Sequence, residues 1–574
     1  MWRIACGVIV AIGALATGCA PATPARNAAP ADGAAQQAPR ATKTLTIAQL
    51  NGVQLYGPWD FSNTSGGGAA LAEIHTVGLV TDGRQGGVEP RLAEKLPSFD
   101  DGSISILPDG RLQTIWKLRP DAKWQDGTPL TADDLAFSFE IFKHPELLST
   151  IDSAMRQASE VRAQDPRTLL VTFRSTYYRA RDIGHRDLWP YPRHLLAEAF
   201  DGEKAGFLKE PYFTTDYVNL GPFRLVEFGL GQNQVFEAFD GYFLGRPQID
   251  RVILRTISDS NTILANLKAG AIDIAGERTL PPDTVAQIRR EWNVDGGGTV
   301  ADRQENWWYA AVQFSPEFGR PPVLSQDVRI RRALVYGLDR ETVGETLLAG
   351  LPDTSADSFM RKNDPRAAAV GAPFAAYRYD VNRAVQEFAG AGWRAGSDGR
   401  LVNQAGEQLA FEVRAPQVNA VEVALVSNYW RQLGADVSEL LPAPALYRDR
   451  EWKSKFPGVE ISARNANEKP FLYLDSRLHP GPENRWEGPT VTHYANPALD
   501  RLIDSLQRAL DEAQQGQILR QLGEIGSNDL PLMPLYFNVA SAPMLKGVRA
   551  LGDDYAASGG VGTYSRNSHT WDRD

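Results

Sequence analysis

Cysteine is almost missing from this 574-residue chain, which has only Cys6 and Cys19. Because both lie within the first 19 residues, the remainder of the chain can form neither a disulfide nor a cysteine-ligated metal site. The seven histidines are scattered, and no two of them stand at the i, i+4 spacing of a helical zinc motif. A site assembled from distant histidines is the alternative left open, and we expect no metal and no cofactor.

Concentrated basic charge and catalytic motifs are missing as well. The chain has a formal net charge of -10 and no basic run, whereas nucleic-acid binding needs clustered Lys and Arg to neutralise phosphates. The motifs G-x-S-x-G, H-E-x-x-H and G-x-x-x-x-G-K-[ST] do not occur, and no nucleophile stands at a recognisable spacing from a base. We therefore predict a protein that neither binds nucleic acid nor acts as an enzyme.

The N-terminus carries an export signal. One basic residue, Arg3, precedes an apolar run over residues 4–15 and small residues up to Cys19. This run is too short to cross about 30 Å of hydrocarbon, but it has the length of a secretory signal core. Residues 16–19, ATGC, resemble the bacterial lipobox, although the leucine that usually begins the box lies one place early here. We predict a lipoprotein signal peptide over residues 1–19 with lipidation at Cys19; an ordinary cleaved signal peptide is the alternative.

Residues 20–42 are rich in Ala, Pro and polar residues and show no hydrophobic periodicity. Such a segment cannot build a core, so we predict a disordered linker. No later apolar run approaches transmembrane length. The body is therefore expected in the periplasm or on the outer face of the cytoplasmic membrane, anchored to the membrane through lipidated Cys19.

From residue 44 onward the pattern is mixed α and β. Residues 44–50, TLTIAQL, alternate and are β-branched, which predicts an early strand, and residues 254–258 predict another. Ile263 and Leu267 follow at helical spacing, and the next strand is expected around Ile272 and Ile274. This succession of strand, helix and strand is typical of an α/β domain.

The stretch from residue 116 to residue 140 contains four aspartates, at positions 121, 126, 133 and 134. The D-x-D-x-D-G spacing of a calcium loop is absent. Thr131 and Asp134 instead have the spacing of a capping box, and Leu135, Phe139 and Phe142 follow on one helical face. We interpret this acidic cluster as scaffold.

The same stretch resembles the hallmark segment of the large solute-binding proteins of ABC importers, the family of oligopeptide, dipeptide and nickel binders. Further segments resemble that family in the order in which it shows them: VEPRLAEKL (88–96), NLGPFRLVEF (219–228), LSQDVRIRRALVYGLDRETV (324–343), YANPALDRLIDSLQ (494–507) and DLPLMPLYF (529–537). The resemblance covers residues 44 to 540.

The resemblance implies an α/β fold of the type II periplasmic-binding-protein kind, with two lobes, a hinge and a subdomain inserted in the first lobe. The first lobe is expected at 43–80, 210–305 and 530–574, the inserted subdomain at 81–209 and the second lobe at 306–529. Ligand would bind between the lobes, which close over it, and the closed monomer would present it to the membrane permease.

The resemblance also points to a specificity segment at residues 460–477. Peptide binders of this family carry there an aspartate that pairs with the peptide ammonium. In this chain Arg464 occupies that position and Asn465 follows. A guanidinium favours a carboxylate, phosphate or polyol instead. We predict that Arg464 and Asn465 contact ligand; a solvated or ion-paired Arg464 is the alternative.

Five aromatic residues complete the predicted site, because aromatic faces bind sugar rings, apolar side chains and cations. Tyr56 and Trp59 follow the first strand, and Trp307 and Trp308 lie near the expected crossover between the lobes. Trp486 follows the specificity segment. Core packing is the alternative for each, and it suits one member of the Trp307–Trp308 pair, since adjacent strand residues face opposite sides.

We predict a solute-binding component of an ABC importer that captures a peptide-like solute. An opine, an oligosaccharide or another anionic or polyol ligand is the alternative within this role. An envelope hydrolase is the alternative from another class, and a chaperone-like or sensory binding protein is a third.

Overall fold

A ten-stranded sheet runs through the structure. The computed structural model describes residues 42–57, 68–84, 87–147, 154–351, 354–357, 359–361, 364, 370, 376–466, 469–552, 555 and 562–574. The predictions for the signal peptide, the linker, Cys19 and Trp59 lie outside the described residues. From Thr42 to Asp574 the chain forms one compact unit.

The sheet mixes parallel and antiparallel neighbours in the order β16-β15-β17-β12-β18-β11-β1-β10-β9-β8. Its strands are β1 (Thr44–Gln49), β8 (Phe223–Phe228), β9 (Gln234–Ala238), β10 (Arg251–Thr256), β11 (Ile274–Ala275), β12 (Gly298–Val312), β15 (Ala410–Arg414), β16 (Asp436–Leu440), β17 (Val459–Asn465) and β18 (Leu532–Leu545).

The predicted βαβ succession is confirmed. Strand β1 pairs in parallel with both β10 and β11. Helix α4 (Ser260–Lys268) connects β10 to β11 and buries Ile263 and Leu267, as the helical spacing predicts. The Asp259 carboxylate accepts a hydrogen bond from the Thr262 amide at 2.7 Å and so caps this helix.

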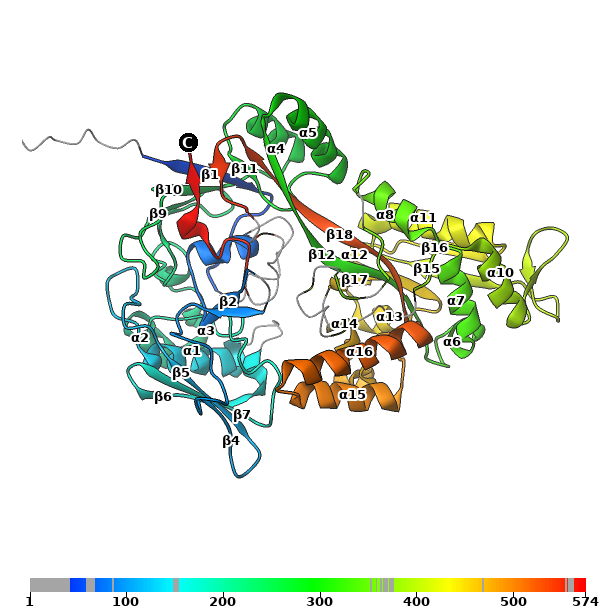
Figure 1. Ribbon diagram of the computed structural model, residues 1–574, viewed down its shortest axis with the longest axis horizontal. Helices are drawn as coiled ribbons and strands as arrows, with labels where there is room; N and C mark the ends of the chain where they lie inside the picture. Colours follow the sequence, from blue (N-terminus) through cyan, green and yellow to red (C-terminus); the bar gives the residue numbers. More distant parts are fainter. Residues whose placement is uncertain are drawn as a thin grey trace, which may run out of the picture. The chain divides into compact units, whose positions relative to one another are not determined.

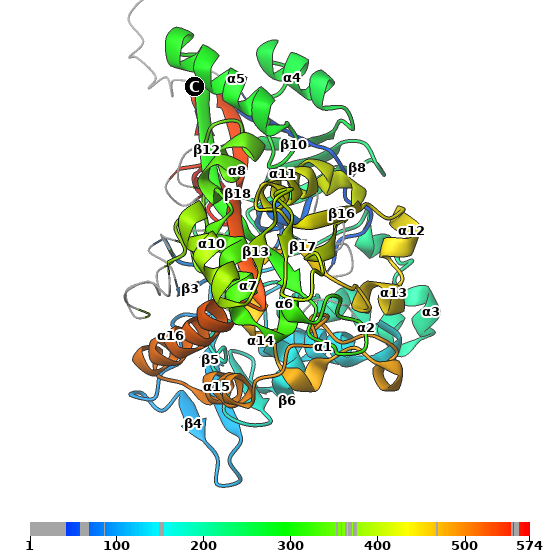
Figure 2. The same cartoon turned by 90° about the vertical axis from the view of Figure 1, so that its right-hand side faces the viewer.

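The longest strands, β12 and β18, lie side by side and join the two halves of the sheet (Figure 1 and Figure 2). Their register shifts between Gln304 and Trp307, where β12 bulges. Before this shift β12 pairs with β18 alone, and after it β12 pairs with both β18 and β17. The shift therefore lies beside the predicted lobe boundary at residue 305; the boundaries themselves stay predictions.

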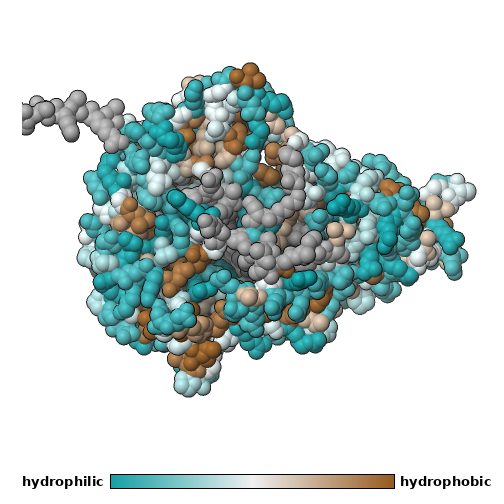
Figure 3. Space-filling model, in the orientation of Figure 1, coloured by the Kyte–Doolittle hydropathy of each residue, from teal (hydrophilic) through white to brown (hydrophobic). Residues whose placement is uncertain are grey.

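Helices make up much of the rest of the structure. Besides the two that are described with the sheets, they are α2 (Arg193–Asp201), α3 (Lys204–Phe207), α5 (Pro282–Asp295), α6 (Val323–Gln326), α7 (Val328–Tyr336), α8 (Arg340–Leu347), α10 (Val381–Gly390), α11 (Ala420–Gln432), α12 (Pro444–Tyr447), α13 (Arg450–Ser454), α14 (Lys469–Leu472), α15 (Pro497–Arg508) and α16 (Glu512–Asp529). None of the helices in the described part of the chain has both the length and the apolar character needed to span a bilayer. The face in Figure 3 is mostly hydrophilic, with hydrophobic residues in small separate groups.

A separate four-stranded sheet lies within the predicted inserted subdomain. It consists of β4 (Ile104–Ile106), β5 (Leu112–Lys117), β7 (Thr168–Phe173) and β6 (Ala158–Asp165), with helix α1 (Ala132–Lys143) nearby in sequence. Shorter strands pair elsewhere: β2 (Val80–Asp82) with β3 (Val88–Pro90), β13 (Arg394–Ala395) with β14 (Leu401–Val402), and β19 (Val548–Arg549) with β20 (Asp572–Arg573).

The interpretation of the acidic cluster as scaffold is supported by the bonds that its aspartates make. The Asp134 carboxylate reaches back to the start of α1 and accepts from the Thr131 amide at 2.9 Å and the Thr131 hydroxyl at 3.0 Å. It also accepts from the Arg193 amide at 2.9 Å, which ties α1 to α2. Asp126 accepts from the Thr128 amide at 2.9 Å within a turn. These carboxylates hold local backbone in place.

Asp134→Ala is expected to lower the free energy of unfolding by about 2 kcal/mol, because it removes the capping-box carboxylate and leaves the part-buried amides of Thr131 and Arg193 without acceptors. Asp134 is 5% exposed. Asp133→Ala is the matched control: Asp133 is exposed in the same first turn, so its loss should cost no more than about 0.5 kcal/mol. Urea unfolding of both variants checks this, and equal losses would contradict the assignment of Asp134 as the cap.

Candidate ligand-binding site

The predicted specificity segment ends at the place where β12 bulges. Arg464 and Asn465 form the carboxyl end of β17, and they lie opposite Trp307 and Asn306 of β12. The Asn306 amide donates to the Asn538 Oδ1 atom of β18 at 2.8 Å. Arg464 and Asn465 therefore lie beside the junction of the two halves of the sheet.

Arg464 is half-buried and has no ion pair within the described part of the chain. Its Nη1 atom donates to the carbonyl of its own neighbour Ala463 at 3.0 Å, and its guanidinium carbon lies 5.7 Å from the centre of the Tyr473 ring. Interaction with Tyr309 is the main cause that raises the pKa of Arg464 above its ordinary value. The guanidinium is thus charged, partly withdrawn from water and available to an anion.

Glu460, the acidic residue on the same face of β17, forms an ion pair with Arg414. Its Oε2 atom accepts from the Arg414 Nε atom at 3.0 Å and lies 2.8 Å from the Arg414 Nη2 atom. Both side chains are 2% exposed, and the Arg414 guanidinium stacks over Trp452 at 4.2 Å. Glu460 therefore forms its ion pair with Arg414 and none with Arg464.

Trp307 and Trp308 lie on opposite faces of β12, as their adjacency requires. Trp307 is 3% exposed and lines a cavity of about 20 Å³ with Phe359 and Phe471, which is room for one water molecule. Trp308 packs against the other core and stacks on Tyr536 with ring centres 5.7 Å apart. Both indole N–H groups are buried and have no acceptor among the described residues.

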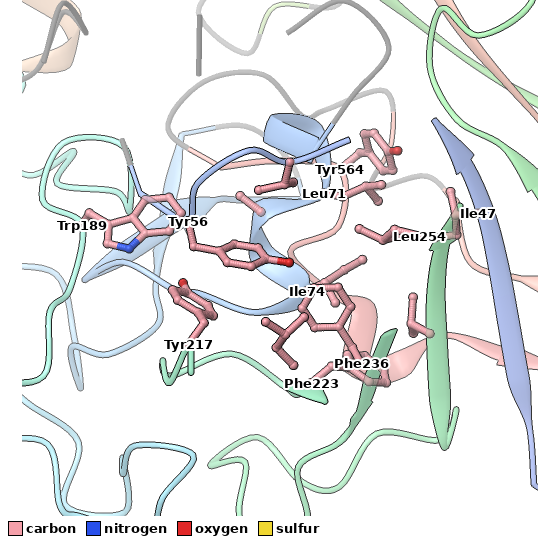
Figure 4. Packing of buried hydrophobic residues seen from close by; sticks show 14 of the residues in the cluster. Ile47, Tyr56, Leu71, Ile74, Trp189, Tyr217, Phe223, Phe236, Leu254 and Tyr564 are labelled. Atoms are coloured by element: carbon pink, nitrogen blue, oxygen red, sulfur yellow. The ribbon is translucent and has the colours of Figure 1, made fainter. Parts of the chain in front are cut away.

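Tyr56 lies in a hydrophobic core. It is 1% exposed, and its ring stacks on Tyr217 with centres 4.3 Å apart (Figure 4). His75 approaches the same ring edge-on at 4.9 Å. This geometry matches the packing alternative for Tyr56, so we leave Tyr56 out of the site proposed below.

Lowering the pH from 7 to 5 is expected to reduce the free energy of unfolding by about 2 kcal/mol through His75 alone. Burial lowers the pKa of His75 to about 3, whereas the unfolded chain titrates near 6.5. The unfolded state therefore binds the proton first, so stability is complete above pH 6.5 and falls as the pH drops toward 3. Burial lowers the pKa of His185 and His569 as well, which acts in the same direction.

Melting temperatures of wild type and His75→Gln, measured between pH 7.5 and pH 5, check this expectation. The comparison is needed because burial raises the pKa of the Glu73 carboxyl, which acts in the opposite direction. His75→Gln should flatten the dependence, and the same pH dependence in both proteins would contradict the account of a buried, neutral His75.

Trp486 lies away from the strands, in the loop before α15. It is half-buried and has a left-handed backbone with φ of 61°, and the Lys455 ammonium lies 4.6 Å from the centre of its ring. Its predicted contact with ligand stays a prediction.

Sequence reasoning missed a charged cluster on the other side of the junction. The Arg303 guanidinium donates to both carboxylate oxygens of Glu277, at 2.6 and 2.8 Å, and to Glu305 at 3.2 Å. The Arg278 Nη1 atom lies 3.4 Å from the second Glu305 oxygen. Glu277 and Arg278 follow β11 directly, and the carboxyl end of a parallel strand is the signal that could have located them.

Among the described residues, no group of three or more His, Cys, Asp or Glu side chains could hold a metal ion.

Comparison with known proteins assigns the family. Residues 87–481 match the family described as bacterial extracellular solute-binding proteins, family 5 Middle, and this match spans more than half of the chain. The chain belongs to this family. The family-5 chain is thus an extracytoplasmic solute-binding component of the kind that ABC importers use, as the sequence predicts.

Named relatives are similar over most of their length. The oligopeptide-binding protein AppA of Bacillus subtilis (strain 168) is 24% identical over 445 residues, which cover 75% of this chain and 76% of AppA. Among solved structures, NikA from Brucella suis in complex with Fe(III)-EDTA has a TM-score of 0.71 at 20% identity, covering 92% of this chain and 100% of NikA. NikZ from Campylobacter jejuni in complex with Ni(L-His) has a TM-score of 0.68 at 21% identity, covering 92% and 99%.

These likenesses confirm the predicted fold class, the α/β type II fold with two lobes. The relatives are binding proteins by name.

Proposed function

We propose that this family-5 protein captures a peptide-like solute through a carboxylate of that solute. The observation that carries this proposal is the half-buried Arg464, which has no ion pair in the described part of the chain and lies at the junction end of β17. Leaving a charge partly buried and unpaired costs free energy, so such a residue favours an external partner.

The chemistry of a guanidinium selects the partner. Its planar donors bind both oxygens of a carboxylate at once, and it cannot accept a hydrogen bond from an ammonium group. AppA is named for oligopeptides, and the NikA structure holds Fe(III)-EDTA, whose ligand is a polycarboxylate. Both precedents agree with a solute that has a carboxylate. An opine meets the same requirement, and a neutral oligosaccharide fits it less well.

Binding between the lobes would couple capture to closure. Arg464 and Asn465 lie beside the junction at the end of β17, and the pair of Glu277 and Arg303 lies on its other side. Trp307 and Trp308 stay predicted contacts next to Arg464 and Asn465. A solute that contacts both sides shifts the population toward the closed form by its extra affinity for that form. The closed form is the one delivered to the permease. Trp59 and Trp486 stay predicted members of this site.

The proposal includes the cell-envelope setting. A lipid on Cys19 and the 20–42 linker would tether a monomer to the membrane with enough reach to meet the permease. Catalysis has no part in this role, because capture and release need no covalent step.

A thermal-shift screen tests the proposal. The protein as the cell exports it, purified in detergent, is heated with short peptides, an opine and neutral oligosaccharides. A true solute at about 100 times its Kd adds about 2.7 kcal/mol of stability, so its melting temperature rises clearly. We expect peptides to stabilise the protein. Stabilisation by neutral oligosaccharides alone would contradict the proposal.

A further inference from the structure

A second cation near Arg464 also has no ion pair within the described part of the chain. Lys453 belongs to α13 and is half-buried, with its ammonium 4.6 Å from the centre of the Tyr447 ring. Neighbouring cations are paired: Arg450 bonds to Glu487, and the Lys455 ammonium lies 2.7 Å from Glu451. Lys453 therefore differs from Arg450 of the same helix, which is paired.

Glu460, the acidic residue on this face of β17, is bonded to other groups. Glu460 is held by Arg414, as described above, and its Oε1 atom also accepts from the Tyr447 hydroxyl at 3.2 Å. Arg414 and Glu460 cancel each other in charge, so Lys453 and Arg464 together leave a local excess of two positive charges. Two like charges that are partly withdrawn from water repel each other unless an anion lies between them.

Tyr447 and Glu460 connect the two cations. The Tyr447 ring contacts Lys453, and its hydroxyl bonds to Glu460, which lies four residues before Arg464 on the same face of β17. Burial lowers the pKa of Lys453; Glu460 opposes this shift, and the charge of Arg464 adds to it. The contacts of Tyr447 thus link Lys453 to the face of β17 that carries Arg464, and the Tyr473 ring lies 5.7 Å from the Arg464 guanidinium carbon.

We infer that Lys453 and Arg464 form a paired cationic subsite, lined by Tyr447 and Tyr473, for a solute that carries two carboxylates. This inference rests on the proposed function, since it assumes that Arg464 binds one of those carboxylates. An acidic peptide offers them as a side chain and a C-terminus, and an opine offers them on one secondary amine. A neutral peptide offers one carboxylate and leaves Lys453 unpaired.

Isothermal titration of the exported protein with three probes tests the inference: Ala-Ala-Ala, Ala-Glu-Ala and octopine. We expect at least one dicarboxylate to bind ten or more times as tightly as Ala-Ala-Ala. Lys453→Met should remove that preference and leave the affinity for Ala-Ala-Ala within about twofold. Arg450→Gln, on the same helix, is the matched control and should change neither. Tight binding of Ala-Glu-Ala would indicate an acidic peptide as the solute, and tight binding of octopine would indicate an opine.

The unliganded melting temperature provides a second readout. If Lys453 pairs with an anion only when solute is bound, Lys453→Met removes an unpaired, partly buried charge from the empty protein. The melting temperature of the empty variant should then be no lower than that of wild type. A lower melting temperature together with an unchanged preference would show that Lys453 has a packing role and would overturn the inference. Equal affinity of wild type for all three probes would also overturn it while leaving the proposed function intact. Binding of none of the probes would overturn both.

Discussion

Arg464→Ala is expected to weaken the binding of a solute with a carboxylate by about 10- to 100-fold. A hydrogen bond to a charged group contributes about 1.5–3 kcal/mol, and a bidentate contact lies at the upper end of that range. Each 1.4 kcal/mol corresponds to tenfold in Kd. Since Arg464 makes no ion pair in the described part of the chain, its loss should not lower the melting temperature of the empty protein.

Two further variants sharpen this experiment. Arg464→Lys keeps the charge but loses the planar pair of donors, so it should recover part of the affinity. Arg224→Ala is the matched control, because Arg224 is an exposed strand arginine of β8 with no ion pair among the described residues. Isothermal titration measures all three. Unchanged affinity in Arg464→Ala would mean that the solute does not contact this residue.

Glu460→Ala is expected to lower the free energy of unfolding by about 3–5 kcal/mol. The change leaves the Arg414 guanidinium buried at 2% exposure without its counter-charge, and breaking a buried pair on one side is the costly case. Tyr447 loses the acceptor for its hydroxyl in the same variant. Urea unfolding followed by tryptophan fluorescence measures the loss, since Trp452 lies against Arg414.

The double variant Arg414→Leu with Glu460→Ala separates charge from packing. Removing both charges should restore most of the lost stability, because no buried charge is left uncompensated. If the double variant is as unstable as the single one, the cost comes from packing around Trp452 and not from the unpaired guanidinium.

Local patterns in the sequence predict the scaffold well. The β-branched alternation at 44–50 gives β1, and the spacing of Ile263 and Leu267 gives α4, because both elements are decided by neighbours within a few residues. Asp134 is recognised as a cap for the same reason. The resemblance to solute-binding proteins supplies the fold class, which local patterns alone do not.

The candidate site is less predictable because its contacts join distant residues. Tyr56 packs on Tyr217, so whether its ring faces a core or a ligand depends on a residue far away in the sequence. Arg303 bonds to Glu277, which lies 26 positions earlier in the chain, and Arg414, not Arg464, pairs with Glu460. The sequence identifies Arg464 as unusual, but only the structure shows that Glu460 is paired with Arg414 and not with Arg464.

The most direct test of the carboxylate contact changes the solute and leaves the protein intact. The tightest peptide from the screen is titrated into wild-type protein as its free acid and as its C-terminal amide, each also against Arg464→Ala. We expect the amide to bind at least tenfold more weakly than the acid to wild type, and the two forms to bind equally to the variant. Equal binding of acid and amide to wild type would contradict recognition of the C-terminal carboxylate by Arg464.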